Sequence, residues 1–96
     1  MRKIEKAMCA AVKRMENLNC GNTKVVVVGG CLAHVYLHNN LIAVVNSSMH
    51  GKFTLAGWNT TTTRSRLNAL GVGVCQRNHV AVYNGAEISS HNWYEF

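Results

Sequence analysis

The side chains best suited to chemistry lie together in one stretch, residues 57–70, which changes from a polar approach into a short helix. Four consecutive threonines lead into Arg64-Ser65-Arg66, and Gly71 follows the helix. A helix N-terminus offers unpaired N–H groups and a partial positive charge, and hydroxyl and guanidinium groups match phosphate oxygens. The stretch therefore predicts an anion-binding site. Its candidate ligand-binding residues are Trp58, Asn59, Thr60, Thr61, Thr62, Thr63, Arg64, Ser65, Arg66 and Asn68.

A purely structural interpretation of the same residues is also open. Thr61 or Thr62 would then be the N-cap of the helix, and both arginines would be solvated or ion-paired. At helical spacing the two arginines fall on the boundary of the apolar stripe, so both guanidinium groups are expected to reach water. The chain has no Gly-x-x-x-x-Gly-Lys, which excludes the phosphate loop of a nucleotide hydrolase.

A second set of polar side chains, His34, Tyr36 and His38, alternates along one expected strand. Four residues of strand separate the two histidines by about 13 Å, which is too far for them to share a metal ion. We therefore predict no metal site and no cofactor. The three side chains instead face outward, toward solvent or a partner. Trp93 and Tyr94 join them as partner-facing candidates, since aromatic rings stack on bases or fill protein pockets.

No group of residues predicts catalysis. Cys75 and His79 are the nearest nucleophile and base, but they point to opposite faces of an expected hairpin. The chain has only four acidic residues, two on the first helix and two near the C-terminal end, so paired-carboxylate chemistry has no support. We expect a protein that is not an enzyme.

Basic residues are in excess, with ten Lys and Arg against four Asp and Glu and a net charge of +6. This charge favours nucleic acid, a nucleotide or an acidic protein surface as the partner. Half of the basic residues lie on the first expected helix, where a solvated face also explains them.

The cysteines and the apolar runs bear on the cellular compartment. The four cysteines form no Cys-x-x-Cys pair, which predicts buried, reduced thiols in the cytoplasm. No apolar run reaches the roughly 18 residues of a spanning helix, and residues 1–19 lack the pattern of a signal peptide. We expect no membrane contact. The oligomeric state stays open, since an exposed strand edge could pair with a second copy.

Hydrophobic periodicity predicts one α+β domain over residues 1–96: an N-terminal amphipathic helix packed on a mainly antiparallel sheet built from hairpins, with a second short helix. The expected elements are, in order, a helix over 2–18 that Gly21 terminates, a strand over 25–28, a hairpin of 31–38 and 41–46 around Asn39-Asn40, a strand over 52–56, the short helix before Gly71, a hairpin of 72–76 and 79–83 around Arg77-Asn78, a turn at Asn84-Gly85, and an aromatic tail over 89–96 that docks back.

The alternation in the first hairpin predicts which side chains enter the core. Its apolar face should receive the first helix, and it comprises Ala33, Val35, Leu37, Ile42 and Val44. In the second helix, Leu67 and Leu70 should point inward. Phe53 and at least one of the two tryptophans are also expected in the core.

Three segments of the chain, residues 1–8, 35–43 and above all 56–70, carry a family likeness. The last segment reads Ala-Gly-Trp-Asn-Thr-Thr-Thr-Thr-Arg-Ser-Arg-Leu-Asn-Ala-Leu. In these segments the chain resembles a group of small uncharacterised proteins of tailed bacteriophages. The resemblance implies a phage protein that acts in the cytoplasm of the bacterial host, and it brings no activity or catalytic residues. Small phage proteins of this kind often modify or block host machinery.

Two functions are consistent with these observations. The first is binding of a phosphate-bearing ligand, a nucleic acid or a nucleotide, through the threonines and arginines of residues 57–70, in order to interfere with a host process or defence. The alternative is a protein–protein inhibitor of a host factor or defence complex, with contacts from the exposed sheet face and the aromatic tail.

Overall fold

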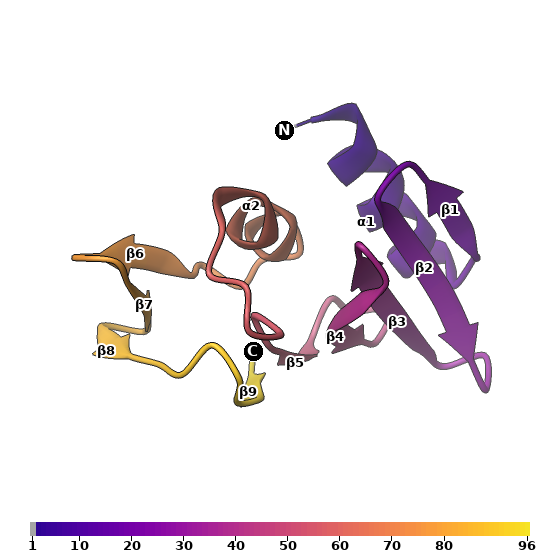
Figure 1. The fold of residues 1–96 in the computed structure, drawn as a ribbon. Coiled ribbons are helices and arrows are strands. Elements are labelled where there is room, and N and C mark those ends of the chain that lie inside the picture. Colours follow the sequence, from indigo (N-terminus) through magenta and orange to yellow (C-terminus); the bar gives the residue numbers. More distant parts are fainter. Residues whose placement is uncertain (1) are drawn as a thin grey trace.

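The computed structural model describes residues 2–96 and contains two helices and nine strands. These elements are α1 (Lys3–Arg14), β1 (Leu18–Cys20), β2 (Thr23–Val28), β3 (Leu32–Leu37), β4 (Asn40–Val45), β5 (Gly51–Phe53), α2 (Thr61–Ala69), β6 (Cys75–Arg77), β7 (Val80–Tyr83), β8 (Ala86–Glu87) and β9 (Tyr94–Glu95). One sheet has the order β1-β2-β3-β4-β5-β9, and a small second sheet has the order β6-β7-β8 (Figure 1). All strand pairs are antiparallel, which confirms the predicted α+β class.

Helix α1 ends earlier than its apolar periodicity predicts. Met15 adopts a left-handed conformation with φ of 52°, and its N–H bonds to the last carbonyl groups of the helix. The chain then turns back, and Leu18 pairs with Val25 as part of β1 rather than continuing the helix. Gly21, expected to end the helix, instead takes a positive φ of 58° between β1 and β2.

The first hairpin turns one residue earlier than expected and contains a β-bulge. His38 and Asn39 occupy the turn with φ of 50° and 66°, and Asn40 pairs with Leu37. The register shifts between Val35 and Tyr36, because Leu41 faces Tyr36 and Ala43 faces Val35. Ile42 is the extra residue of the bulge.

The bulge changes which side of β4 enters the core. Ile42 and Ala43 are both buried, and beyond them the alternation is reversed. Val45 is therefore buried, whereas Val44, expected in the core, is only half-buried on the opposite face. The prediction for Val44 was wrong because a bulge of this kind has no signal in the alternation of apolar residues.

The C-terminal part of the chain forms the second sheet and returns to the first. Asn78 and His79 occupy the hairpin turn, one residue later than expected, while Asn84-Gly85 turns as predicted. Strand β9 pairs with β5, and the rings of Tyr94 and Phe96 lie 5.7 and 5.9 Å from that of Phe53. The expected docking of the tail is confirmed.

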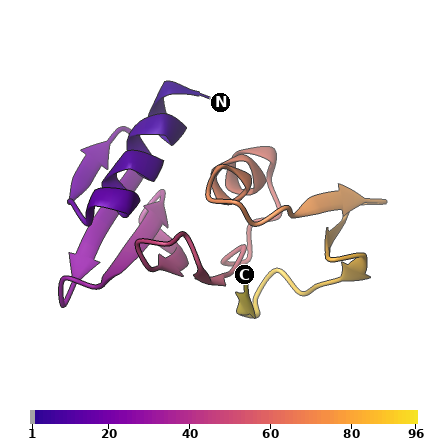
Figure 2. The same cartoon turned by 180° about the vertical axis from the view of Figure 1, so that it is seen from behind.

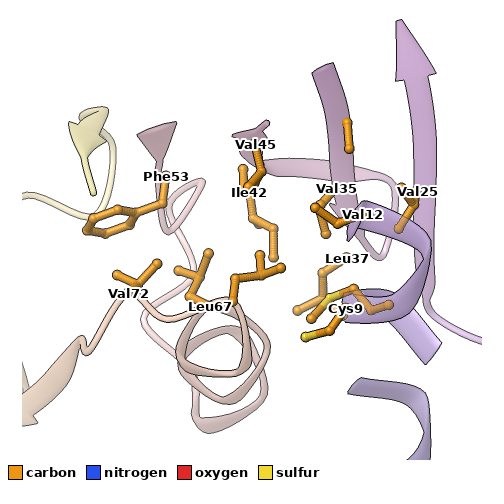
Figure 3. Packing of buried hydrophobic residues seen from close by; sticks show 14 of the residues in the cluster. Cys9, Val12, Val25, Val35, Leu37, Ile42, Val45, Phe53, Leu67 and Val72 are labelled. Atoms are coloured by element: carbon orange, nitrogen blue, oxygen red, sulfur yellow. The ribbon is translucent and has the colours of Figure 1, made fainter. Parts of the chain in front are cut away.

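The core lies between α1, α2 and one face of the large sheet. Helix α1 packs on β1 and β2 and contacts α2, which in turn contacts β4 (Figure 2). Figure 3 shows core side chains from both helices and the strands pointing toward one another, with Leu67 of α2 among them. Leu67, Leu70 and Phe53 are buried as predicted. No helix among residues 2–96 covers the opposite face of the large sheet.

Several side chains lie in other environments than the sequence predicts. Both tryptophans are exposed, Trp58 by 58% and Trp93 by 43%, so the expectation of a buried tryptophan was wrong. Of the four cysteines only Cys9 is buried, and Cys31 and Cys75 are exposed. No helix in the described residues is long and apolar enough to cross a membrane.

Candidate functional site

The threonines at the start of α2 divide into structural and free side chains. Thr60 is the N-cap, and its hydroxyl oxygen accepts a hydrogen bond from the backbone N–H of Thr63 at 3.2 Å. The hydroxyl groups of Thr60 and Thr63 also lie 2.9 Å apart. The capping interpretation therefore holds, although at Thr60 rather than at Thr61 or Thr62. Within residues 2–96, the hydroxyl of Thr62 has no hydrogen-bond partner and is available to a ligand.

Arg66 is a structural residue, and the prediction that it reaches water was wrong. Its side chain is 4% exposed and its Nη1 lies 2.9 Å from Oε2 of Glu5 on α1. The same guanidinium group donates to Thr23 Oγ1 at 3.0 Å and to Asn22 Oδ1 at 3.3 Å. The face of α2 that carries Arg66 packs against α1 and the β1–β2 turn, a contact that the spacing of apolar residues does not reveal.

Glu5 is the acidic centre of this buried group. Burial by itself raises the pKa of its carboxyl group, but hydrogen bonds from Ser65, Arg66 and the backbone of Arg2, together with the charge of Arg66, lower the pKa below its ordinary value. Glu5 is therefore ionised at neutral pH and fully paired. Glu5, Ser65 and Arg66 join the two helices and leave no free charge for a ligand.

Three other predicted site residues also bond within the chain. The guanidinium group of Arg64 donates to Asn59 Oδ1, and Asn59 Nδ2 lies 3.5 Å from the carbonyl oxygen of His79. Asn68 binds the backbone of Val74 twice, donating to its carbonyl at 2.8 Å and accepting from its N–H at 2.7 Å. These contacts hold the start of β6 and the second hairpin against α2.

Of the remaining predicted residues, Trp58, Thr60, Thr62 and Thr63 surround one cavity of about 380 Å³, whereas Thr61 is exposed and lies outside its lining. We name it the Trp58 pocket. Its lining residues come from β3, the first hairpin turn, β4, the segment leading into α2 and the first turn of α2, and they are Leu37, His38, Asn40, Ile42, Leu55, Trp58, Thr60, Thr62 and Thr63. Leu37, Ile42 and Leu55 are buried core residues and form an apolar wall, while Trp58 is largely exposed. None of the lining residues among residues 2–96 is Lys, Arg, Asp or Glu.

A polar pocket of about 250 Å³ shares one lining residue, His38, with the first pocket. We name it the Lys24 pocket. Its lining residues come from the β1–β2 and β3–β4 turns and their flanks, and they are Asn19, Gly21, Asn22, Lys24, His38 and Asn39. Lys24 Nζ lies 4.9 Å from the centre of the Tyr36 ring. Lys24 and Tyr36 lie on the face of the sheet opposite to the core, so the two pockets have one lining residue in common, His38 in the hairpin turn.

Sequence reasoning missed most of this arrangement. Leu37, Ile42 and Leu55 carried no functional signal, because an apolar residue in a strand predicts only core packing. Lys24 lies more than thirty positions before Trp58, and only the sheet brings their surroundings together at His38. His38 lies beside both pockets because it occupies the hairpin turn, one residue earlier than the turn expected at Asn39-Asn40.

The predicted partner-facing residues are divided between separate surfaces. His34 and Tyr36 lie half-buried on the uncovered face of the large sheet, and His38 lies at its end beside the two pockets. Tyr94 packs on Phe53, and its hydroxyl accepts a hydrogen bond from the N–H of Ser89 at 2.8 Å. Trp93 lines a shallow groove of about 500 Å³ with Leu32, Val44, Gly51 and Lys52.

The fold and the pockets define a small α+β protein with a surface cavity beside the start of α2. Among residues 2–96 no group of three or more His, Cys, Asp or Glu side chains gathers in a way that could hold a metal ion. Residues 1–95 match the family model of the Kyanoviridae Gp96 protein, and the chain belongs to this family. Kyanoviridae are bacteriophages, so the phage origin implied by the resemblance is confirmed. Comparisons with curated proteins and with solved structures find no match.

Proposed function

We propose that this phage protein is a non-enzymatic binding protein for a phosphate-bearing ligand with a planar ring, namely a nucleotide, free or at the end of a nucleic-acid strand. The observation that carries the proposal is that the Trp58 and Lys24 pockets share the exposed turn residue His38. One pocket is apolar with an exposed aromatic wall, and the other is polar and basic. The combination matches a ligand with one apolar planar part and one anionic part.

The Trp58 pocket has the properties of a site for a nucleobase. Its volume of about 380 Å³ lies within the range of small-molecule sites, which are mostly apolar with a few polar groups. A base stacks favourably on an exposed indole such as that of Trp58. Asn40 and Thr62 can supply the hydrogen bonds to the polar edge of the base, because neither side chain bonds to another described residue.

The Lys24 pocket has the properties of a site for the phosphate. Lysine binds phosphate as a point charge, and the amide N–H groups of asparagine donate to its oxygens. The lining contains no acidic residue among those described, so nothing there repels an anion. This assignment replaces Arg64 and Arg66 by Lys24 as the cation of the site. Sequestration of such a ligand in the host cytoplasm would interfere with a host process or defence.

Isothermal titration calorimetry with nucleoside monophosphates and with the corresponding nucleosides tests the proposal. Trp58→Ala should weaken nucleotide binding about tenfold or more, since base stacking contributes about 1–3 kcal/mol. Trp93→Ala is the matched control, because it removes the other exposed tryptophan, which lies outside both pockets. The proposal would be contradicted if the two variants had equal affinity for a nucleoside monophosphate, or if the parent protein bound no nucleoside monophosphate.

The phosphate part of the ligand is tested separately. Lys24→Gln should weaken binding of the nucleoside monophosphate and leave binding of the nucleoside unaffected. Lys52→Gln, at an exposed lysine of β5, should change neither affinity. Affinity for a single-stranded oligonucleotide should fall steeply with added salt. A nucleoside that binds as tightly as its monophosphate would exclude the Lys24 pocket as the phosphate site.

A second candidate function is inhibition of a host protein, and the groove beside Trp93 favours it. This groove lies on the uncovered face of the large sheet, and the side chains of Leu32 and Trp93 that line it are 38% and 43% exposed. Exposed apolar side chains around a hollow are typical of protein interfaces. Native mass spectrometry of protein from infected cells would show a stoichiometric host polypeptide that Trp93→Ala loses and Trp58→Ala retains.

A further inference from the structure

A third hollow lies between α1 and the C-terminal end of α2, away from the pockets described above. Its volume is about 370 Å³, and we name it the α1 groove. Its lining residues come from one face of α1, the loop before β5 and the end of α2, and they are Lys6, Cys9, Ala10, Lys13, Arg14, Met49 and Ala69. Lys6, Lys13 and Arg14 are exposed, whereas Ala10, Met49 and Ala69 are half-buried.

The exposed charges of α1 and its N-cap are all positive. Five basic side chains are solvent-exposed there, namely Arg2, Lys3, Lys6, Lys13 and Arg14. The helix has one acidic residue, Glu5, but that carboxylate is buried against Arg66 and does not offset the surface charge. The nearest exposed acid, Glu16, follows the helix. Half of the basic residues of the chain thus stand on one helix without an exposed acidic neighbour within it.

The apolar floor distinguishes the kind of partner that this charge attracts. A nucleic-acid backbone is bound by cations and polar groups, and it gains little from Ala10, Met49 and Ala69. An amphipathic protein helix carries apolar side chains on one face and charges beside them, which matches an apolar floor with a basic rim. Methionine adapts its shape to different apolar partners. Basic rim charges also steer an acidic partner and raise its association rate.

From this complementarity we infer that the α1 groove binds an acidic, amphipathic segment of a second protein. The apolar side chains of that segment contact Ala10, Met49 and Ala69, and its carboxylates face Lys6, Lys13 and Arg14. This interaction is independent of the proposed nucleotide site, because the two share no residue. It would allow the phage protein to hold a host protein on one surface and a small ligand on another.

The test uses a fluorescent helical peptide of Leu and Glu with apolar residues at three- and four-residue spacing, and the same peptide with Gln in place of Glu. Fluorescence anisotropy should show saturable binding of the Glu peptide by the full chain. The double variant K6E/K13E should weaken it about tenfold or more. The control K3E/K52E makes the same change in net charge at two exposed lysines outside the groove, and it should change the affinity less than threefold.

A second measurement reports on the floor of the groove. The methyl resonance of Met49 in a protein labelled with ¹³C-methyl methionine should shift on addition of the Glu peptide, while that of buried Met8 should stay in place. Equal weakening in the two charge variants would mean that only the net charge matters, and would overturn the inference. The inference would also be overturned if the Glu peptide did not bind and the chain instead bound a DNA duplex that K6E/K13E does not bind. Nucleic acid would then be the occupant of the groove.

Discussion

Arg66→Met removes the cationic half of a buried ion pair and leaves the carboxylate of Glu5 without the charged side chain that it pairs with. Arg66 and Glu5 each have side chains that are 4% exposed, and Nη1 and Oε2 are 2.9 Å apart. Methionine retains much of the arginine stem, so packing is largely conserved and the loss is mainly electrostatic. The hydrogen bonds from Arg66 to Thr23 and Asn22 are lost at the same time.

The expected loss is about 3–5 kcal/mol of unfolding free energy, which is the usual cost of removing one partner of a buried pair. The hydrogen bonds belong to the same group, so their contributions are not added. A domain of 96 residues is stable by roughly 5–14 kcal/mol at 0.05–0.15 kcal/mol per residue. The substitution therefore removes a large part of the stability, and a less stable parent would be partly unfolded.

Urea denaturation followed by far-ultraviolet circular dichroism measures the effect. With an m-value of about 2 kcal/mol/M, the midpoint should fall by roughly 2 M. The double variant E5Q/R66M should be more stable than R66M by about 1 kcal/mol or more, because it removes the unpaired buried charge. Arg64→Met is the control, since that guanidinium is only partly buried and donates to Asn59 alone; it should cost about 1 kcal/mol or less.

Two outcomes would refute this reasoning. If the free energy of unfolding of R66M were within about 0.5 kcal/mol of that of the parent, the pair would contribute no stability, which is often the result for exposed ion pairs. A double variant less stable than R66M would show that Glu5 acts through contacts other than Arg66. In the second case the hydrogen bond from Ser65 would be the main partner of the carboxylate.

Three further predictions concern pH, the helix cap and a close backbone contact. Because the pKa of Glu5 is lowered in the folded state, the stability that its carboxylate contributes is present above the ordinary carboxyl pKa and is lost as the pH falls through the lowered value. Urea midpoints measured over a pH series should show this loss in the parent protein and not in Glu5→Gln. Thr60→Ala should cost about 1 kcal/mol by removing the cap of α2, and Thr60→Ser should recover most of it in thermal melts. Gly51→Ala should disrupt the pairing of β4 with β5, because a Cβ would lie 1.9 Å from the carbonyl oxygen of Val44, and a folded variant with unchanged amide exchange in β4 would contradict this contact.

Local chemistry was enough to predict both helices and the two hairpins, but not the short strands β1, β8 and β9. Apolar steps of three and four identified α1, and β-branched runs identified β2 to β4. The turns of both hairpins lay within one residue of the prediction. Asparagine tolerates positive φ at either central position of a two-residue turn, so neighbouring polar residues leave the register ambiguous by one.

The candidate site was predicted only in part. One of the four threonines, Thr60, did prove to be a helix cap beside a cavity, and Trp58 lines that cavity as its exposed wall. Arg66 was misplaced because helical periodicity gives the angle of a side chain around its own helix and not what packs on that side. Arg66 lies on the side of α2 that meets Glu5, which is 61 positions away in the chain. The ion pair between them neutralises the positive charge that was expected to bind a ligand.

The sequence by itself therefore determined the α+β class, the hairpins, a threonine cap of α2 to within one or two residues and the basic surface of α1. These features depend on residues that are neighbours along the chain, within a turn of helix or a pair of strands. Only the tertiary structure decided the bulge at Ile42, the burial of Arg66 and the meeting of the Trp58 and Lys24 pockets at His38. Each of these depends on how segments distant in sequence pack, and packing is set by the fit of whole surfaces rather than by any local pattern.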